Sequence, residues 1–80
     1  MRDLLIVLPK DSRPSYLRLA QALRVAIQGG RVEPGQSIPS TRVLAGRFGL
    51  HRHTVMAALD ELVAEGWLEA ERGHCYRASR

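Results

Sequence analysis

The sequence has few of the features that support catalysis, secretion or membrane insertion. Cys75 is the only cysteine, so no disulfide can form within the chain, and a reducing compartment is expected. The apolar run Leu4–Leu8 ends at Pro9 and is too short for a signal peptide or a membrane span. We find no glycine-rich phosphate loop, paired-carboxylate site or Ser/His/Asp set. These absences predict a cytoplasmic protein that is not an enzyme.

Carboxylates are absent from one stretch of the chain, Ser40–Leu59. This stretch carries three arginines, and the acids of the second half of the chain begin only at Asp60. The formal net charge of +4 permits an anionic partner such as nucleic acid without requiring one. A protein that inserts the N-terminal end of a helix into a DNA groove needs basic residues and no acidic ones near that end, because carboxylates there would repel the DNA phosphates.

The same stretch has the pattern of a helix-turn-helix. Leu44 and Phe48 lie one helical turn apart, and Gly49 follows where a left-handed residue can end a helix. A second helix is expected over about residues 52–65, because apolar residues recur there at helical spacing and Gly66 follows. Those apolar residues are Val55, Ala58, Leu59 and Leu62.

The first turn of that second helix carries polar side chains, at the end that reaches base edges in helix-turn-helix proteins. They are Arg52, His53 and Thr54. The alternative is a winged-helix module that binds a protein without specific DNA binding, because two packed helices alone do not establish function. A protein-docking face would be apolar at this position, so the polar residues favour double-stranded DNA.

The other segments complete the order of a winged helix. We divide the 80 residues into an N-terminal strand and loop at 1–13 and a DNA-binding domain at 14–80. The expected fold is mainly α with a small β part: three helices, a C-terminal β-hairpin wing and a short N-terminal strand. Further signals are Pro14 at a helix start, Gly29-Gly30 at its end, a turn at Pro34-Gly35, Ile38 as the one buried residue of that connection, Ser40 as an N-cap, and hairpin strands starting at Trp67 and Cys75.

In this order the segments resemble the N-terminal DNA-binding domain of the GntR family of bacterial transcription regulators. The resemblance runs from about Pro14 to Glu69 through PSYLRLAQALRVAIQGG, VEPGQSIPSTRVLAGRFGL and HRHTVMAALDELVAEGWLE. The opening LLIVLPKDSRPSYLRLAQAL is most similar to the MocR or YtrA branches. In the MocR branch the domain is fused to an aminotransferase-like domain that binds pyridoxal phosphate. The resemblance therefore implies no cofactor in this chain, and pyridoxal phosphate only in a further C-terminal domain.

The resemblance also implies a set of DNA contacts and a homodimeric full-length regulator on an operator with two half-sites. Arg47 is a further candidate from its charge alone, as a phosphate contact or a solvated side chain. The contacts implied by the family pattern are Arg42 in the second helix, Arg52, His53 and Thr54 at the start of the recognition helix, and Arg72 and Gly73 at the wing tip.

Three features depart from the family pattern. His51 stands where Ser, Thr or Asn usually caps the recognition helix, so that end is expected to fray or to be satisfied by DNA phosphate. His53 replaces a small polar residue, and the wing sequence RGHCYR lacks the second glycine of the family. These histidines, with His74 and Cys75, are zinc-type ligands. His51 and His53 lie two residues apart and do not share a helical face, so we expect no metal site.

Overall fold

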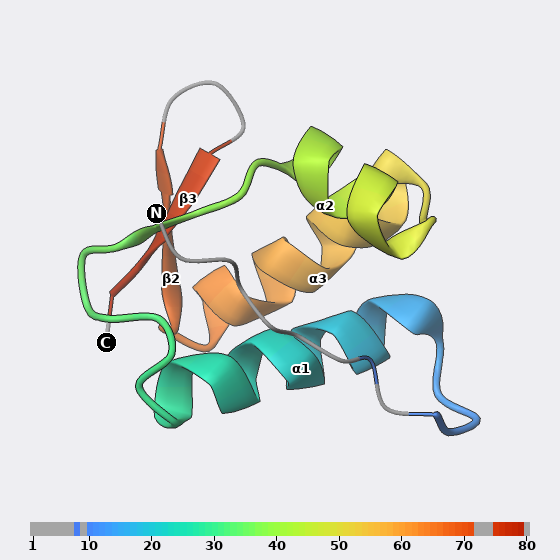
Figure 1. Cartoon of the computed structure of the whole chain (residues 1–80), viewed down its shortest axis with the longest axis horizontal. Coiled ribbons are helices and arrows are strands. Elements are labelled where there is room, and N and C mark those ends of the chain that lie inside the picture. The colour runs from blue at the N-terminus through green and yellow to red at the C-terminus, as the bar shows by residue number, and fades with distance from the viewer. Residues whose placement is uncertain (1–7, 9, 72–74, 80) are drawn as a thin grey trace.

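Three helices and three short strands make up the domain in the computed structural model, which describes residues 8, 10–71 and 75–79. Helix α3 lies between α1 and α2, and the sheet lies beside the C-terminal end of α3 (Figure 1). This arrangement confirms the predicted winged helix-turn-helix. The elements are α1 (Ser15–Gln28), β1 (Ser37–Ile38), α2 (Thr41–Phe48), α3 (Arg52–Ala64), β2 (Leu68–Glu71) and β3 (Cys75–Ala78).

The sheet is antiparallel, with the strand order β1-β3-β2. Strands β2 and β3 form the hairpin that the sequence predicts as the wing. Strand β1 pairs with the other side of β3, so the connection between α1 and α2 is fastened to the wing. The registers pair Leu68 with Ala78 and Glu71 with Cys75 in the hairpin, and Ile38 with Tyr76 across β1 and β3.

A single apolar core joins the three helices to the sheet. Its largest fully buried side chains are Leu19, Leu23, Val32, Leu44, Val55, Leu59 and Leu62. The prediction that Ile38 is the one buried residue of its connection was wrong, because Val32 is only 1% exposed. The backbone N–H groups of Arg31 and Val32 both donate to the carbonyl oxygen of Ala26. This reversal turns Val32 back onto the core, which the local sequence does not reveal.

The segment before α1 is described only in part. Apart from Leu8, the predicted strand Leu4–Leu8 lies outside the described residues. Leu8 has no regular secondary structure and packs against the core while partly buried. In the loop that follows, the guanidinium of Arg13 lies 2.7 Å from the carboxylate of Asp11. Hydrogen bonds from Arg13 lower the pKa of Asp11 to about 2.

Candidate nucleic-acid interface

The ends of α2 fix how the chain enters α3. The hydroxyl of Ser40 accepts a hydrogen bond from the backbone N–H of Val43 at 3.3 Å, which confirms the predicted N-cap. Gly49 has a φ of 65°, and its N–H donates to the carbonyl oxygen of Ala45. That oxygen also accepts from the N–H of Leu50. A left-handed residue therefore stops α2 as predicted, and α3 begins three residues later.

We expect Ser40→Ala to destabilise the domain by about 1 kcal/mol, because the N–H of Val43 loses the hydroxyl that accepts its hydrogen bond. Urea unfolding followed by the fluorescence of Trp67 measures this loss. Ser40→Asn is the matched control, because asparagine is an equally good N-cap and should leave the free energy of unfolding nearly unchanged. Equal stability of the alanine and asparagine variants would contradict the role of the cap.

The first turn of α3 begins without a side-chain cap. His51 occupies the N-cap position with extended backbone angles, and its imidazole makes no capping hydrogen bond to the described residues. Its carbonyl oxygen accepts from the N–H of Val55 at 3.1 Å, so the helix itself is regular from its start. The imidazole therefore leaves α3 without a side-chain cap, as its poor capping ability predicts, and acceptance from these N–H groups by a DNA phosphate stays a prediction.

The end of α3 sets the position of the wing. Gly66 has a φ of 83°, its N–H donates to Val63, and the N–H of Trp67 donates to Leu62. These two bonds form a Schellman motif. The motif explains why β2 begins at Leu68, one residue after the predicted strand start at Trp67. The hairpin thus leaves α3 in a direction set by a left-handed glycine.

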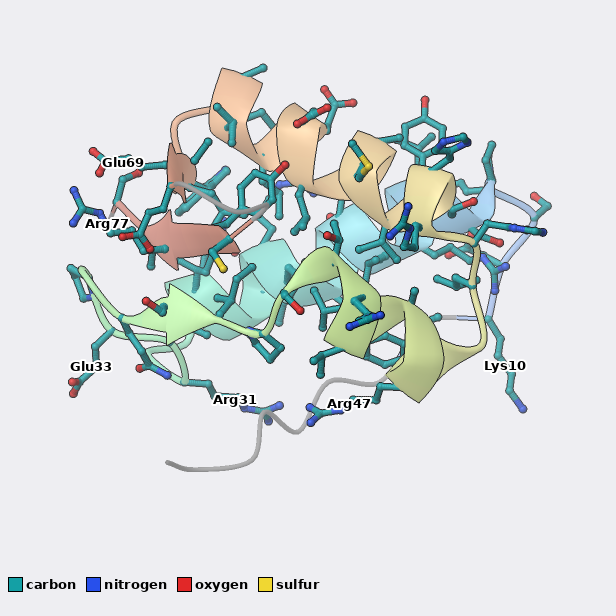
Figure 2. All side chains as sticks on the ribbon, turned by 90° about the horizontal axis from the view of Figure 1, so that it is seen from above. Lys10, Arg31, Glu33, Arg47, Glu69 and Arg77 are labelled. Atoms are coloured by element: carbon teal, nitrogen blue, oxygen red, sulfur yellow. The ribbon has the colours of Figure 1, made fainter. Side chains whose placement is uncertain are left out.

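The structure places the predicted site residues of the helix-turn-helix on two consecutive helices. Arg42 and Arg47 are exposed on α2, and Figure 2 shows Arg47 pointing outward from that helix. Arg52 and His53 are exposed in the first turn of α3, whereas Thr54 is half-buried. Solvent-exposed donors therefore lie on both sides of the turn. Whether each one contacts DNA stays a prediction.

An open hollow marks the start of α3, and its lining consists of His51, Arg52 and His53. The two predicted wing-tip contacts, Arg72 and Gly73, lie outside the described residues. Among the described residues no three His, Cys, Asp or Glu side chains gather as a metal site requires. Because His74 is not described, the absence of a metal site stays a prediction.

In the part of the chain that the structure describes, ion pairs lie at the C-terminal end of α3 and across the hairpin. Arg24 of α1 pairs with Glu65 at 2.9 Å, and Arg77 pairs with Glu69 at 2.8 Å across the hairpin. Figure 2 shows Glu69 and Arg77 at the sheet, away from Arg47. Within the described parts of the chain, neither Arg42 nor Arg52 has an ion-pair partner. Both guanidinium groups are free to meet an anion.

A hydrogen bond joins the wing to α3, and no local sequence pattern predicts it. The hydroxyl of Tyr76 in β3 donates to Oδ1 of Asp60 in α3 at 3.3 Å. Burial raises the pKa of Tyr76, and the neighbouring carboxylate of Asp60 raises it further. The tyrosine therefore stays a hydrogen-bond donor at neutral pH and ties the hairpin to the outer side of α3.

Comparison with known proteins supports this interpretation of the fold. Residues 15–76 match the family described as "Bacterial regulatory proteins, gntR family". The chain is 43% identical over 60 residues to the arabinose metabolism transcriptional repressor of Geobacillus stearothermophilus, covering 75% of this chain and 16% of the relative. It is 36% identical over 70 residues to the probable rhizopine catabolism regulatory protein MocR of Rhizobium meliloti, covering 86% of this chain and 14% of the relative.

Two solved structures extend the similarity to three dimensions. YtrA from Sulfolobus acidocaldarius, a GntR-family transcription factor, has a TM-score of 0.86 and 28% identity, covering 96% of this chain and 82% of that one. The DNA-binding domain of AraR in complex with operator ORE1 has a TM-score of 0.80 and 29% identity, covering 96% of this chain and 98% of that one. No helix among the described residues is long and apolar enough to cross a membrane. The chain belongs to the GntR family of bacterial regulatory proteins and has the fold of its winged helix-turn-helix DNA-binding domain.

Proposed function

We propose that this chain binds operator DNA in a sequence-specific manner, with α3 in the major groove. One observation carries the proposal: the guanidinium groups of Arg42 and Arg52 have no ion-pair partner among the described residues. The helix-turn-helix around them contains no carboxylate between residues 40 and 59. The AraR domain, which has the same fold, is known in complexes with its operators. A domain of this fold therefore binds operator DNA in that relative, and exposed arginines of α2 and α3 give this chain the positive charge for such binding.

Each candidate residue has a role that follows from its chemistry. Arg52 reads a base edge, because its guanidinium can donate two hydrogen bonds to guanine in the major groove. Arg42, Arg47 and Thr54 contact phosphates, together with the uncapped N–H groups at the start of α3. His53 lies beside Arg52 and adds a second side chain at the base edges. In the same proposal, Arg72 and Gly73 of the wing contact the minor groove.

The whole regulator is proposed to be a cytoplasmic homodimer that controls transcription. The domain formed by this chain is proposed to have no catalytic role. The chain spans less than a fifth of the curated relatives named above, so the remaining length of those proteins has no counterpart in it. DNA binding by the domain is proposed to need no cofactor. Pyridoxal phosphate would belong only to a C-terminal domain of the MocR kind.

We expect duplex binding by the 80-residue chain to weaken steeply with salt. Each phosphate neutralised by an arginine releases condensed counterions, so the slope of log K against log[salt] should steepen by about 0.9 per phosphate contact. Titration of a labelled duplex, obtained by selecting bound sequences from a random pool, at several salt concentrations measures the slope. The Arg42→Ala variant should make the slope shallower by about 0.9, the change expected for the loss of one phosphate contact.

Arg24→Gln is the matched control for this titration, because the charge of Arg24 is paired with Glu65 at the C-terminal end of α3, far along the helix from Arg52. It should leave the slope unchanged. A binding constant that is the same at low and moderate salt would refute the proposal and would favour a winged helix that docks a protein.

We expect Arg52→Ala to weaken binding to the selected duplex by about 1–3 kcal/mol, because a bidentate contact to a base is lost. Binding to random DNA should fall much less. Arg47→Ala is the comparison, because loss of a phosphate contact should weaken binding about equally on both duplexes. Equal losses on selected and random DNA for Arg52→Ala would show that Arg52 contacts only the backbone.

A further inference from the structure

The exposed side of α3 changes character after its first turn. Arg52 and His53 occupy the first turn, and Met56, Ala57 and Asp60 continue the same side at helical spacing. Arg52, His53, Ala57 and Asp60 are exposed, and Met56 is half-buried. The opposite side of the helix consists of the buried residues Val55, Ala58, Leu59 and Leu62.

Met56 and Ala57 form an apolar step on this side, and no polar side chain lies between them and the donors of the first turn. In the described chain, the partly buried apolar residues that pack against the core do not include Met56. Its half-buried side chain thus lies outside the described core cluster. The step lies about 6 Å along the helix from Arg52, close to the spacing of two base pairs.

The apolar step ends at a carboxylate that is held in place. Asp60 accepts a hydrogen bond from the hydroxyl of Tyr76, which holds its carboxylate in position at the next turn of α3. A carboxylate there would repel phosphates, so the proposed groove contact of α3 is limited to its first two turns. A surface of two apolar residues between Arg52 and Asp60 is too small for a protein interface, which buries about 800 Å² on each partner.

We infer that Met56 and Ala57 form a subsite for the methyl group of a thymine, one or two base pairs from the base read by Arg52. This inference rests on the proposed function. In the major groove, thymine alone presents a methyl group, and apolar side chains recognise it by excluding water. The continuity of the apolar step with the donors of the first turn places both in the same groove. The predicted half-site therefore contains a thymine at a fixed distance from a guanine.

Replacement of thymine by deoxyuracil tests the subsite, because it removes one methyl group and keeps base pairing and charge. The selected duplex is synthesised with each thymine replaced in turn, and each version is titrated with the 80-residue chain. We expect one or two positions at which binding weakens about fourfold, the factor that corresponds to burial of one methyl-sized group. The other positions should bind like the parent duplex.

Two variants identify the protein side of the contact. With Met56→Ala and with Ala57→Ser, the effect of the same deoxyuracil should shrink toward zero, because the methyl group no longer meets the original apolar surface. Ala64→Ser is the matched control, because Ala64 is exposed at the far end of α3. It should keep the fourfold effect. Unfolding curves followed by Trp67 fluorescence show whether each variant is folded.

The outcomes separate the subsite from the proposed function. Equal binding of all deoxyuracil duplexes by a chain that still binds in a salt-dependent manner would overturn the subsite and leave the proposed function intact. An effect of the same size in the parent chain and in both variants would also overturn it, because the methyl group would then act through the shape of the DNA. Failure to select any duplex would refute the proposed function and the subsite together.

Discussion

Leu59→Ala is expected to destabilise the domain by about 2–5 kcal/mol, because it removes a fully buried side chain and leaves a cavity. The loss is a large part of the roughly 5–15 kcal/mol by which natural domains are stable. Leu59 belongs to α3 on the side opposite the exposed donors, within the core shared by all three helices. Few other contacts can compensate, since a chain of about this size buries only about 60% of its unfolded surface.

Urea unfolding followed by the fluorescence of Trp67 measures this effect as a lower midpoint with an unchanged slope. Val25→Ala is the control, because Val25 is the apolar residue of α1 that is 52% exposed. Its truncation should change the free energy of unfolding by less than about 0.5 kcal/mol. Similar losses of stability for Leu59→Ala and Val25→Ala would show that Leu59 is not part of the buried core.

The elements that local chemistry specifies could be predicted from the sequence. Ser40 caps α2, Gly49 ends it, and Gly66 ends α3, each for a reason that involves neighbouring residues only. The apolar spacing of α3 likewise predicts which of its sides is buried. These signals, combined with the family resemblance, were sufficient for the winged-helix fold and for the placement of Arg52 in an exposed first turn.

The features that the sequence did not reveal depend on residues far apart in the chain. Val32 is buried because the chain folds back over the end of α1, and Ile38 lies beside Tyr76 because β1 pairs with β3. The ion pair of Arg24 with Glu65 spans 41 positions. No periodicity or turn signal encodes such partners, since they exist only once the helices have packed.

The candidate site divides in the same way. The donors of the first turn of α3 could be named from the sequence, because their position in a helix-turn-helix is local. Met56 and Ala57 were not among the predicted contacts, because they are apolar and carry no donor, although the spacing of α3 places them off its buried side. Packing of α3 between α1 and α2 decides which apolar residues remain outside (Figure 1). The tie between Tyr76 and Asp60, which bounds that surface, is also a tertiary contact.

Joining two copies of the chain through a dimerising coiled coil is expected to tighten binding to a duplex with two half-sites by about 10²–10⁴-fold. A single domain offers one recognition helix with few base contacts, and each good bidentate contact discriminates by only about 1–3 kcal/mol. Once one domain is bound, the second meets its half-site at an effective concentration of order millimolar. Strand β3 ends on the side of the molecule away from α2, which leaves room for the fusion (Figure 1).

Affinity titrations on duplexes with one and with two half-sites measure this gain, which should vanish on the single half-site. A fusion to a monomeric coiled-coil variant controls for the added mass and charge. The expectation requires that the unfused chain be a monomer at micromolar concentration in sedimentation experiments. A dimeric unfused chain with nanomolar affinity would contradict it, and the dimer interface would then lie within the 80 residues themselves. In that case the apolar run Leu4–Leu8 would be the first segment to mutate, although five residues fall far short of the roughly 1,200 Å² buried in a stable interface.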